Sequence, residues 1–329
     1  PVFDGDLLLA DTDFFPWKLR TDLVVVGQAY GRGKSSFDAA VAVDGKVQKR
    51  IRVIGDRECA MLSDTEVIVS PPARVDKIPL SYAFAYGGHD AAAEAKYANP
   101  VLKKAGLSMA DVDPRSASTF TYLRNPAGRG FLIEATPEGV AGLKLPNLED
   151  PQDVLTPDRI VVGDPRRWPH QPLPQSLGWL AHDWFPRVSL LGLKFALAEA
   201  LGEKLPELAR GFAPKELWSP PESNDFAFRF NNGASPGLQL PYLAGSEKLT
   251  LENLHPKHPS WTLKLPGHRP NISVDGRKGT LKETEAAIHT VVVEPDADRL
   301  SVVWRGAAPA LRPYLSEELE KMPFRIEWP

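Results

Sequence analysis

The first place where the chain could do chemistry is a glycine-rich turn that carries Lys34 and Ser35 after an apolar run. A phosphate-binding loop needs Gly, four residues and then Gly-Lys-Ser/Thr, and it must open a helix whose N-terminal amides hold the anion. Here five residues separate Gly27 from Gly33, one more than that loop allows. Residues 37–43 then alternate with a period of two, which indicates a strand. We therefore expect residues 31–34 to be a turn between strands and not a nucleotide site.

Histidine supplies a second kind of candidate site. The segment His255-Pro256-Lys257-His258, with His268 ten residues further on, is the only cluster. The adjacent prolines disfavour the helix on which zinc proteases arrange their ligands, and no cysteine lies nearby to complete a structural zinc site. We expect a solvated loop and no metal.

Acid–base or nucleophilic catalysis has little support in the residue pattern. His170, His182 and Asp183 lie among tryptophans and could form a general acid–base pair in a pocket. No Gly-x-Ser-x-Gly motif supplies a nucleophile, and Cys59 lacks the signature of a reactive thiol. Glu149 lies in a turn-like segment, where solvation of the carboxylate is the default. We expect no catalytic residue and no cofactor, and hence a protein that is not an enzyme.

Protein–protein contact is the remaining chemistry that the side chains offer. The segment 163–187 is dense in proline and tryptophan, and aromatic side chains are enriched at interfaces. We expect most of the eight tryptophans to lie in the core. The candidates for contact with a partner are Trp168, Trp179, Trp184 and Arg187.

Composition excludes several classes of partner. The 329 residues are 43% hydrophobic and 25% charged, as in soluble globular proteins. The net charge of −3 gives no reason to expect binding to nucleic acid or to an anionic membrane. A single cysteine excludes an internal disulfide framework and fits the reducing cytoplasm. No apolar run approaches the ~20 residues of a membrane span, and no signal peptide opens the chain.

The positioning elements are mostly short strands. Asp44-Gly45 is a two-residue hairpin signal, because a type I′ turn needs positive φ at both central positions. Proline, at 32 residues, is scattered along the chain and leaves room for few long helices. We expect strands at 21–27, 37–43, 47–53, 66–69, 78–86, 131–133, 140–145, 226–230, 248–251, 261–265, 272–274, 288–293 and 300–304, with a helical turn at 316–321. We expect one or two helical turns at 91–98 inside a long insertion, 89–120, and one convincing helix at 190–208.

These elements predict a mainly β (β-rich α+β) fold, in which antiparallel sheets form a sandwich or a barrel-like body. The principal helix lies near 190–208. The expected organisation is a β-rich part over residues 1–165 and a second part, with the helix, over 166–329. A single continuous domain is the alternative.

Several phrases, taken together and in order, resemble a known family. They are Asp22-Leu23-Val24-Val25-Val26-Gly27, Gly55-Asp56-Arg57, Tyr82-Ala83-Phe84-Ala85-Tyr86-Gly87-Gly88, Asn125-Pro126-x-Gly128-x-Gly130, Leu145-Pro146-Asn147-Leu148-Glu149, Phe185-Pro186-Arg187, Phe230-Asn231-Asn232-Gly233-Ala234 and Gly245-Ser246-Glu247 followed by Leu251-Glu252-Asn253-Leu254-His255-Pro256. The series covers roughly residues 5 to 305 and resembles the DUF2169 family, which is found beside bacterial type VI secretion genes.

The resemblance implies a cytoplasmic bacterial adaptor or chaperone that helps to load a toxic effector onto the VgrG spike, without catalysis or cofactor. No established functional residue is carried over. We expect the matched residues to have structural roles, the glycines and Asn-Pro steps as turn determinants: Asp22, Gly55, Asp56, Arg57, Gly87, Gly88, Asn125, Pro126, Gly128 and Gly130. Asp22 and Arg57 are expected to form a structural pair.

Two other functions stay open at this point. One is a hydrolase or carbohydrate-active enzyme on a β-sandwich that uses His182 or Asp183 in the Trp-lined segment 168–187. The other is a structural component of the secretion particle, which would form rings or fibres.

Overall fold

The computed structural model describes residues 2–4, 7–10, 18–63, 66–104, 120–164, 167, 170–182, 184, 187, 231–277, 279–308 and 314–329. The predicted helix at 190–208, the predicted strand at 226–230, Trp168 and Asp183 lie outside these residues. None of the described helices is long and apolar enough to cross a membrane.

The described chain is built mainly of strands, which confirms the predicted β-rich class with several antiparallel sheets. The strands are β1 (Val2–Asp4), β2 (Leu7–Ala10), β3 (Thr21–Val25), β4 (Gln28–Lys34), β5 (Ser36–Val43), β6 (Lys46–Ile54), β7 (Cys59–Met61), β8 (Val67–Val69), β9 (Val75–Pro79), β10 (Tyr86–Gly87), β11 (Arg129–Gly130), β12 (Leu148–Glu149), β13 (Gln239–Leu240), β14 (Lys248–Glu252), β15 (Ser260–Lys264), β16 (Asn271–Asp275), β17 (Leu281–Thr284), β18 (Ala287–Glu294), β19 (Arg299–Arg305) and β20 (Phe324–Glu327).

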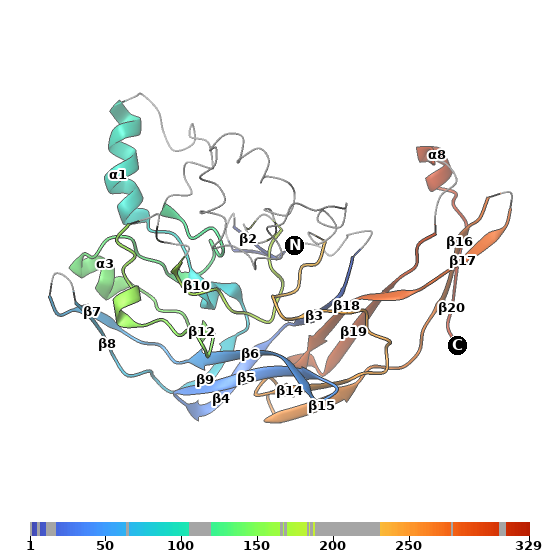
Figure 1. Cartoon of the computed structure of the whole chain (residues 1–329), viewed down its shortest axis with the longest axis horizontal. Coiled ribbons are helices and arrows are strands. Elements are labelled where there is room, and N and C mark those ends of the chain that lie inside the picture. The colour runs from blue at the N-terminus through green and yellow to red at the C-terminus, as the bar shows by residue number, and fades with distance from the viewer. Residues whose placement is uncertain are drawn as a thin grey trace.

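Helices are short or peripheral in the described residues. They are α1 (Ala91–Lys104), α3 (Pro137–Gly142) and α8 (Ser316–Leu319), with the 3-10 turns η1 (Tyr82–Phe84), η4 (Pro157–Arg159) and η9 (Pro295–Ala297). Helix α1 stands out from the body in Figure 1, at the opposite end from the β16–β17–β20 sheet.

Two sheets form the centre of the molecule. One has the order β12-β6-β5-β14-β15, and the other has the order β13-β3-β18-β19. Their pairings are antiparallel except that β3 runs parallel to β18. Strands from residues 1–165 thus pair directly with strands from residues 166–329, β3 with β18 and β5 with β14, so the two expected parts share both sheets.

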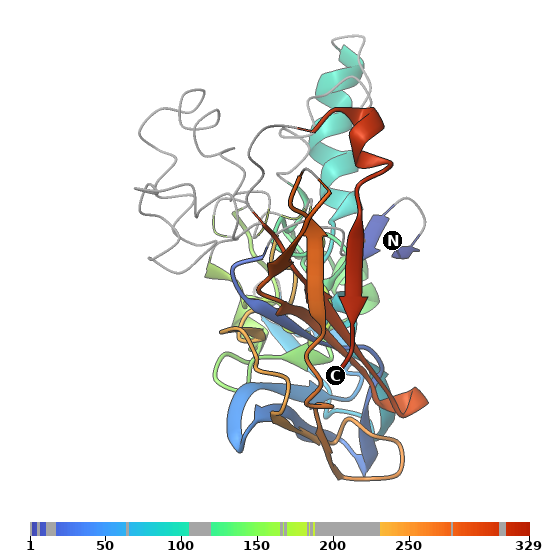
Figure 2. The ribbon, with the colours of Figure 1, turned by 90° about the vertical axis from the view of Figure 1, so that its right-hand side faces the viewer.

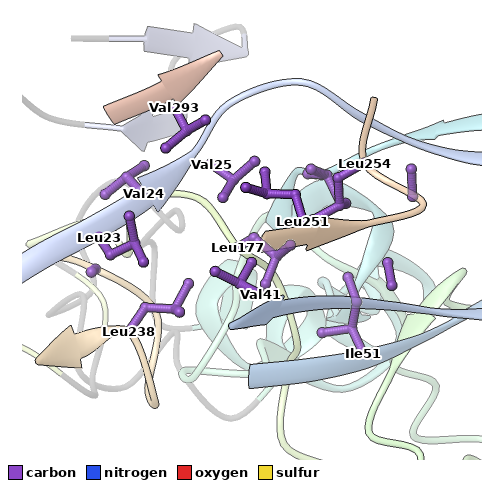
Figure 3. Packing of buried hydrophobic residues seen from close by; sticks show 14 of the residues in the cluster. Leu23, Val24, Val25, Val41, Ile51, Leu177, Leu238, Leu251, Leu254 and Val293 are labelled. Carbon is purple, nitrogen blue, oxygen red and sulfur yellow. The ribbon is translucent and has the colours of Figure 1, made fainter. Parts of the chain in front are cut away.

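One hydrophobic core is built from both sheets. Leu23 and Val25 of β3, Val41 of β5, Ile51 of β6 and Leu251 of β14 are buried in it. Figure 3 shows these side chains gathered between β3 on one side and β5, β6 and β14 on the other. Because β-branched and leucine side chains suit a pleated, buried surface, the sequence runs that supply them become the strands of this core.

The hairpin predicted from Asp44-Gly45 is confirmed. Asp44 has φ 48° and Gly45 has φ 79°, as a type I′ turn requires. Residues Val41 and Ala42 of β5 oppose Lys49 and Val47 of β6, so Gln48 is an extra, bulged residue. The bulge interrupts the alternation of β6, so Val47 is exposed while Lys49 and Ile51 are buried.

Several local predictions are wrong. Residues 78–86 are not one strand: β9 ends at Pro79, and Ser81 caps the 3-10 turn η1 by accepting the N–H of Ala83. Residues 140–145 do not form a strand, because Thr136 caps α3 by accepting the N–H of Gly139 at 3.0 Å and Pro137 opens that helix. Residues 31–34 continue β4 through an irregularity in its pairing with β9 instead of forming a turn.

Helix α1 is longer than the helical turns expected at 91–98. It is capped by Asp90, whose carboxylate accepts the N–H of Ala93 at 3.0 Å. The rest of the expected insertion, residues 105–119, lies outside the described chain. The expected strand at 131–133 is also absent, since only Leu132 forms an isolated bridge there, to Val161. The other expected strands in the described chain, and the helical turn near 316, are present with shifts of one or two residues at their ends.

The close packing around Gly55 predicts that adding one methyl group there lowers the stability of the fold. A Cβ at Gly55 would overlap the carbonyl oxygen of Ala73, whereas a Cβ at Gly142, the last residue of α3, would meet no atom within 4 Å. We expect Gly55→Ala to lower the free energy of unfolding by about 2 kcal/mol or more through overpacking. Gly142→Ala should leave it unchanged or raise it by about 0.5 kcal/mol. Urea denaturation of both variants checks this, and equal effects would contradict the steric argument.

Candidate functional site

The most concentrated polar chemistry surrounds Asp22, a fully buried carboxylate on β3. Its Oδ2 accepts hydrogen bonds from Lys18 Nζ at 2.7 Å and from the Gly233 N–H at 2.9 Å, and its Oδ1 accepts one from Asn232 Nδ2 at 3.0 Å. Lys18 Nζ also donates to Thr290 Oγ1 at 2.9 Å. We call Lys18, Asp22, Asn232, Gly233 and Thr290 the Asp22 cluster.

The sheet places this cluster. Asp22 lies opposite Thr290 in the parallel register of β3 and β18, so the two side chains share one face. Burial of a carboxylate without a partner costs several kcal/mol, and here a buried ammonium and two N–H donors compensate for it. Donors from the same chain therefore satisfy both oxygens of the Asp22 carboxylate. We interpret Asp22 as a structural group and not as a catalytic base.

Trp179 lies at the edge of the Asp22 cluster and is half-buried. Lys18 Nζ is 5.3 Å from the centroid of its ring, within the range of a cation–π contact. Its backbone forms a bridge with Ala234, and the next residue, Leu180, donates its N–H to the Gly233 carbonyl at 2.8 Å. The cluster thus holds the segments around residues 180 and 233 side by side.

The other predicted contact residues are placed differently. Trp184 is 1% exposed and packs edge-on against Tyr82, with 5.4 Å between the ring centroids. Arg187 is 4% exposed and donates from Nη1 to the Leu180 carbonyl at 2.7 Å. Neither side chain offers a free surface in this structure, and contact of both with a partner stays a prediction. Of the four predicted contact residues, only Trp179 is both described and partly exposed.

The segment after Gly233 is also held from β6. Buried Lys49 donates from Nζ to the Pro236 carbonyl at 2.8 Å. Burial lowers the pKa of Lys49 to about 8, because the charged ammonium is poorly solvated there. Asp150 acts weakly in the opposite direction. Residues 232–236 are therefore held by Asp22 on one side and by Lys49 on the other.

A second buried polar group lies around Arg57. Arg57 forms an ion pair with Glu149 and donates to the Pro146 carbonyl at 2.6 Å. The other carboxylate oxygen of Glu149 accepts the Leu155 N–H at 2.6 Å. Burial raises the pKa of Glu149, and the guanidinium of Arg57 opposes that rise. The predicted pair of Asp22 with Arg57 is wrong, since Asp22 pairs with Lys18 and Arg57 with Glu149.

Asp56 and Asn147 complete this region. The Asn147 amide donates to the Ile54 carbonyl at 2.9 Å and to Asp56 Oδ1 at 3.0 Å, so it joins the end of β6 to the start of β12. Glu149, expected to be solvated, is 2% exposed. The phrase Leu145-Pro146-Asn147-Leu148-Glu149 therefore closes one end of the five-stranded sheet.

The phrases around residues 87 and 125 form one interlocked turn. The Asn125 amide donates to the carbonyls of Tyr82 at 2.8 Å and Tyr86 at 3.0 Å, and the Asn125 carbonyl accepts the Gly88 N–H at 2.9 Å. A Cβ at Gly87 would overlap that carbonyl, and Gly87 has φ 152°. Pro126 and Gly128 follow Asn125 in the same turn, in which a Cβ at Gly128 would overlap the Asn125 amide, and Gly130 lies just beyond it in β11.

The histidine segment is ordered by its own chain. His255 is 1% exposed; its Nε2 lies 2.8 Å from Asp298 Oδ1, and its Nδ1 accepts the N–H groups of Lys257 and His258 at 3.1 Å. The hydrogen bond from His255 lowers the pKa of Asp298. Among the residues that the structure describes, no three or more His, Cys, Asp or Glu side chains lie together where they could hold a metal ion. Cys59 is buried, and burial raises the pKa of its thiol.

A family model matches residues 4–305, most of the chain. The chain belongs to the DUF2169 family, described as an uncharacterized protein conserved in bacteria. Comparisons with curated proteins and with solved structures found no match. The family phrases supply Asp22, Asn232 and Gly233 to the Asp22 cluster, and Asp56, Arg57, Asn147 and Glu149 to the region around Arg57.

Sequence reasoning missed two members of the Asp22 cluster, Lys18 and Thr290. Lys18 lies four residues before Asp22, but no helix or strand contains both, so the spacing carried no signal. Thr290 is far away in sequence and comes close only through the parallel pairing of β3 with β18. For the partner of Arg57 the sequence did contain a signal, because Glu149 ends one of the family phrases.

Burial of Lys49 gives the stability of the fold a testable dependence on pH. Between about pH 8 and its ordinary pKa of 10.5, Lys49 is mostly deprotonated when folded and protonated when unfolded, so stability rises with pH in that window. We expect a gain of about 1.5 kcal/mol between about pH 8 and about pH 9.5. The window stops below the ionisation of tyrosines such as Tyr82, whose pKa burial raises to about 12 and which would reverse the trend above pH 10.

Urea denaturation at both pH values, with the variant Lys49→Met, measures this effect. The variant should lose the gain, and Lys46→Met, at an exposed position of the same strand, should keep it. A gain of equal size in Lys49→Met would mean that another group carries it.

Proposed function

We propose that the protein is a non-catalytic adaptor that binds a toxic effector of a bacterial type VI secretion system in the cytoplasm and helps to load it onto the VgrG spike. The observation that carries the proposal is the ordered series of phrases from Asp22 to Pro256, within the 4–305 match to the DUF2169 family. That resemblance implies the adaptor role. The proposal requires no cofactor, nucleic acid or membrane.

The burial of the phrase residues supports separate sets of residues for maintaining the fold and for binding an effector. Asp22, Arg57, Glu149, Asn125 and Asn232 are buried or nearly so and bonded within the chain, so they maintain the body and do not contact an effector. Recognition therefore falls to partly exposed side chains, and aromatic residues contribute most per residue at interfaces. Trp179 meets both conditions, because it is half-buried and is fixed at the Asp22 cluster by Lys18.

Trp179 can be tested against a matched tryptophan. Trp261 on β15 is also half-buried and packs against the same core. We expect Trp179→Leu to weaken effector capture at least tenfold, since loss of an anchoring aromatic residue typically costs about 2 kcal/mol. Trp261→Leu should capture the effector like the wild type. The measurement is the amount of effector that each tagged variant retains. Thermal unfolding of the two variants checks that they are equally stable.

The function itself is tested in the native bacterium. Deletion of the gene should abolish export of the neighbouring toxin while export of the spike and tube proteins continues, and a tagged copy should co-purify with that toxin and with the VgrG-type protein. Unchanged toxin export, together with co-purification of neither protein, would overturn the proposal. Sedimentation of the purified chain as rings or fibres would favour a structural component of the particle instead.

A further inference from the structure

The small sheet at the C-terminal side of the described chain has an apolar outer strand. Its order is β17-β16-β20, and β20 pairs antiparallel with β16. Figure 1 shows this sheet extending from the body, and Figure 2 shows β20, in red, as one of its strands. All four residues of β20 are exposed, and Phe324, Ile326 and the following Trp328 are 69%, 52% and 61% exposed.

An exposed apolar edge strand is a template for pairing with another strand. Among the described strands only β16 pairs with β20, so the second edge of β20 is available to a partner. Phe324 and Ile326 lie opposite Val274 and Ile272 of β16, which places the apolar side chains of both strands on one face. Arg325 and Glu327 lie on the other face. The strand therefore offers one apolar face and one charged face to whatever extends the sheet.

The sequence of this strand is complementary to itself in one register. If two copies of β20 run antiparallel with Ile326 opposite Ile326, then Phe324 lies opposite Trp328 and Arg325 lies opposite Glu327 of the other copy. Opposite residues in an antiparallel pair point to the same face. Aromatic side chains then meet aromatic side chains on one face, and each Arg meets a Glu on the other, both of which are favourable cross-strand pairs.

The neighbouring registers lack this match. A shift that places Arg325 opposite Arg325, or Glu327 opposite Glu327, sets like charges against each other, which is destabilising. Sliding one copy of β20 by a single residue places apolar residues opposite charged ones. The apolar side chains of one copy then lie on the same face as the charged side chains of the other. A single register thus satisfies both faces.

We infer that the protein forms a homodimer in which the β20 strands of two copies pair antiparallel about Ile326 and join the two small sheets into one of six strands. The self-complementary order of aromatic and charged residues favours a second copy over a foreign strand, because a two-fold interface presents the same surface from both sides. Strand β20 lies beyond the family match, which ends at residue 305, so the inferred dimer does not rest on the proposed adaptor role. The interface is short, and we expect association at about 10–100 µM.

Disulfide trapping tests the register on the purified full-length chain. In the inferred dimer, Ile326→Cys places two thiols directly opposite each other, within the ~7 Å between Cα atoms that a disulfide tolerates. The matched control is Phe324→Cys, whose two copies are separated by four residues along the strands, roughly 13 Å. The native Cys59 is buried and serves as the common background.

Under mild oxidation we expect a covalent dimer from Ile326→Cys, none from Phe324→Cys, and a dimer from the double variant Phe324→Cys/Trp328→Cys. Equal cross-linking of the two single variants would overturn the register. A wild-type chain that stays monomeric by sedimentation equilibrium at about 200 µM, with no cross-linking of Ile326→Cys, would overturn the dimer.

A charge exchange at two exposed side chains of β20 provides an independent test. Arg325→Glu or Glu327→Arg alone sets two like-charge pairs across the interface and should weaken dimerisation about tenfold. The double variant restores both pairs and should return to the wild-type constant. A double variant as weak as the single ones would contradict the pairing of Arg325 with Glu327.

Discussion

A carboxylate removed from water must find its hydrogen-bond donors within the chain, and Asp22 is the residue on which this demand falls most heavily. Its donors come from Lys18, just before β3, and from Asn232 and Gly233, more than 200 residues later. Lys18 in turn needs Thr290 of β18. Because an unpaired buried charge costs several kcal/mol, each donor must be in place when β3 is buried. The constraint fixes β3 beside β18 and brings residue 233 against residue 180.

The rest of the architecture is consistent with this arrangement. Once β3 lies parallel to β18, its apolar residues face the core that β5, β6 and β14 close from the other side. Lys49 and the region around Arg57 are smaller examples of the same physics, in which buried charged groups hold irregular segments against regular strands. The family phrases therefore describe how the body is built. We propose that partners bind at side chains on the surface, such as Trp179, and at β20 outside the family match.

Much of this fold could be predicted from local pattern. The hairpin at Asp44-Gly45, the strands β14, β15, β16, β18 and β19 and the β-rich class follow from alternation and turn chemistry that act over a few residues. Predictions failed where a cap outweighed composition. The Oγ1 of Thr136 starts a helix in a segment that reads as a strand, and Ser81 ends an aromatic run in a 3-10 turn. The partners of Asp22 and Arg57 could not be assigned, because ion pairs between distant segments depend on strand order, and nothing local specifies that β3 runs beside β18.

The central claim is that Lys18 and Asp22 act as one buried unit, and a double-mutant cycle of unfolding free energies tests it most directly. Asp22→Asn should lower the free energy of unfolding by about 3 kcal/mol or more, since it leaves the Lys18 ammonium buried without its counter-charge. Lys18→Met should also destabilise the protein. The double variant Lys18→Met/Asp22→Asn should be at least about 1 kcal/mol more stable than the sum of the two losses predicts. Losses that add to within about 0.5 kcal/mol would show that the two charges do not depend on each other and would contradict the account.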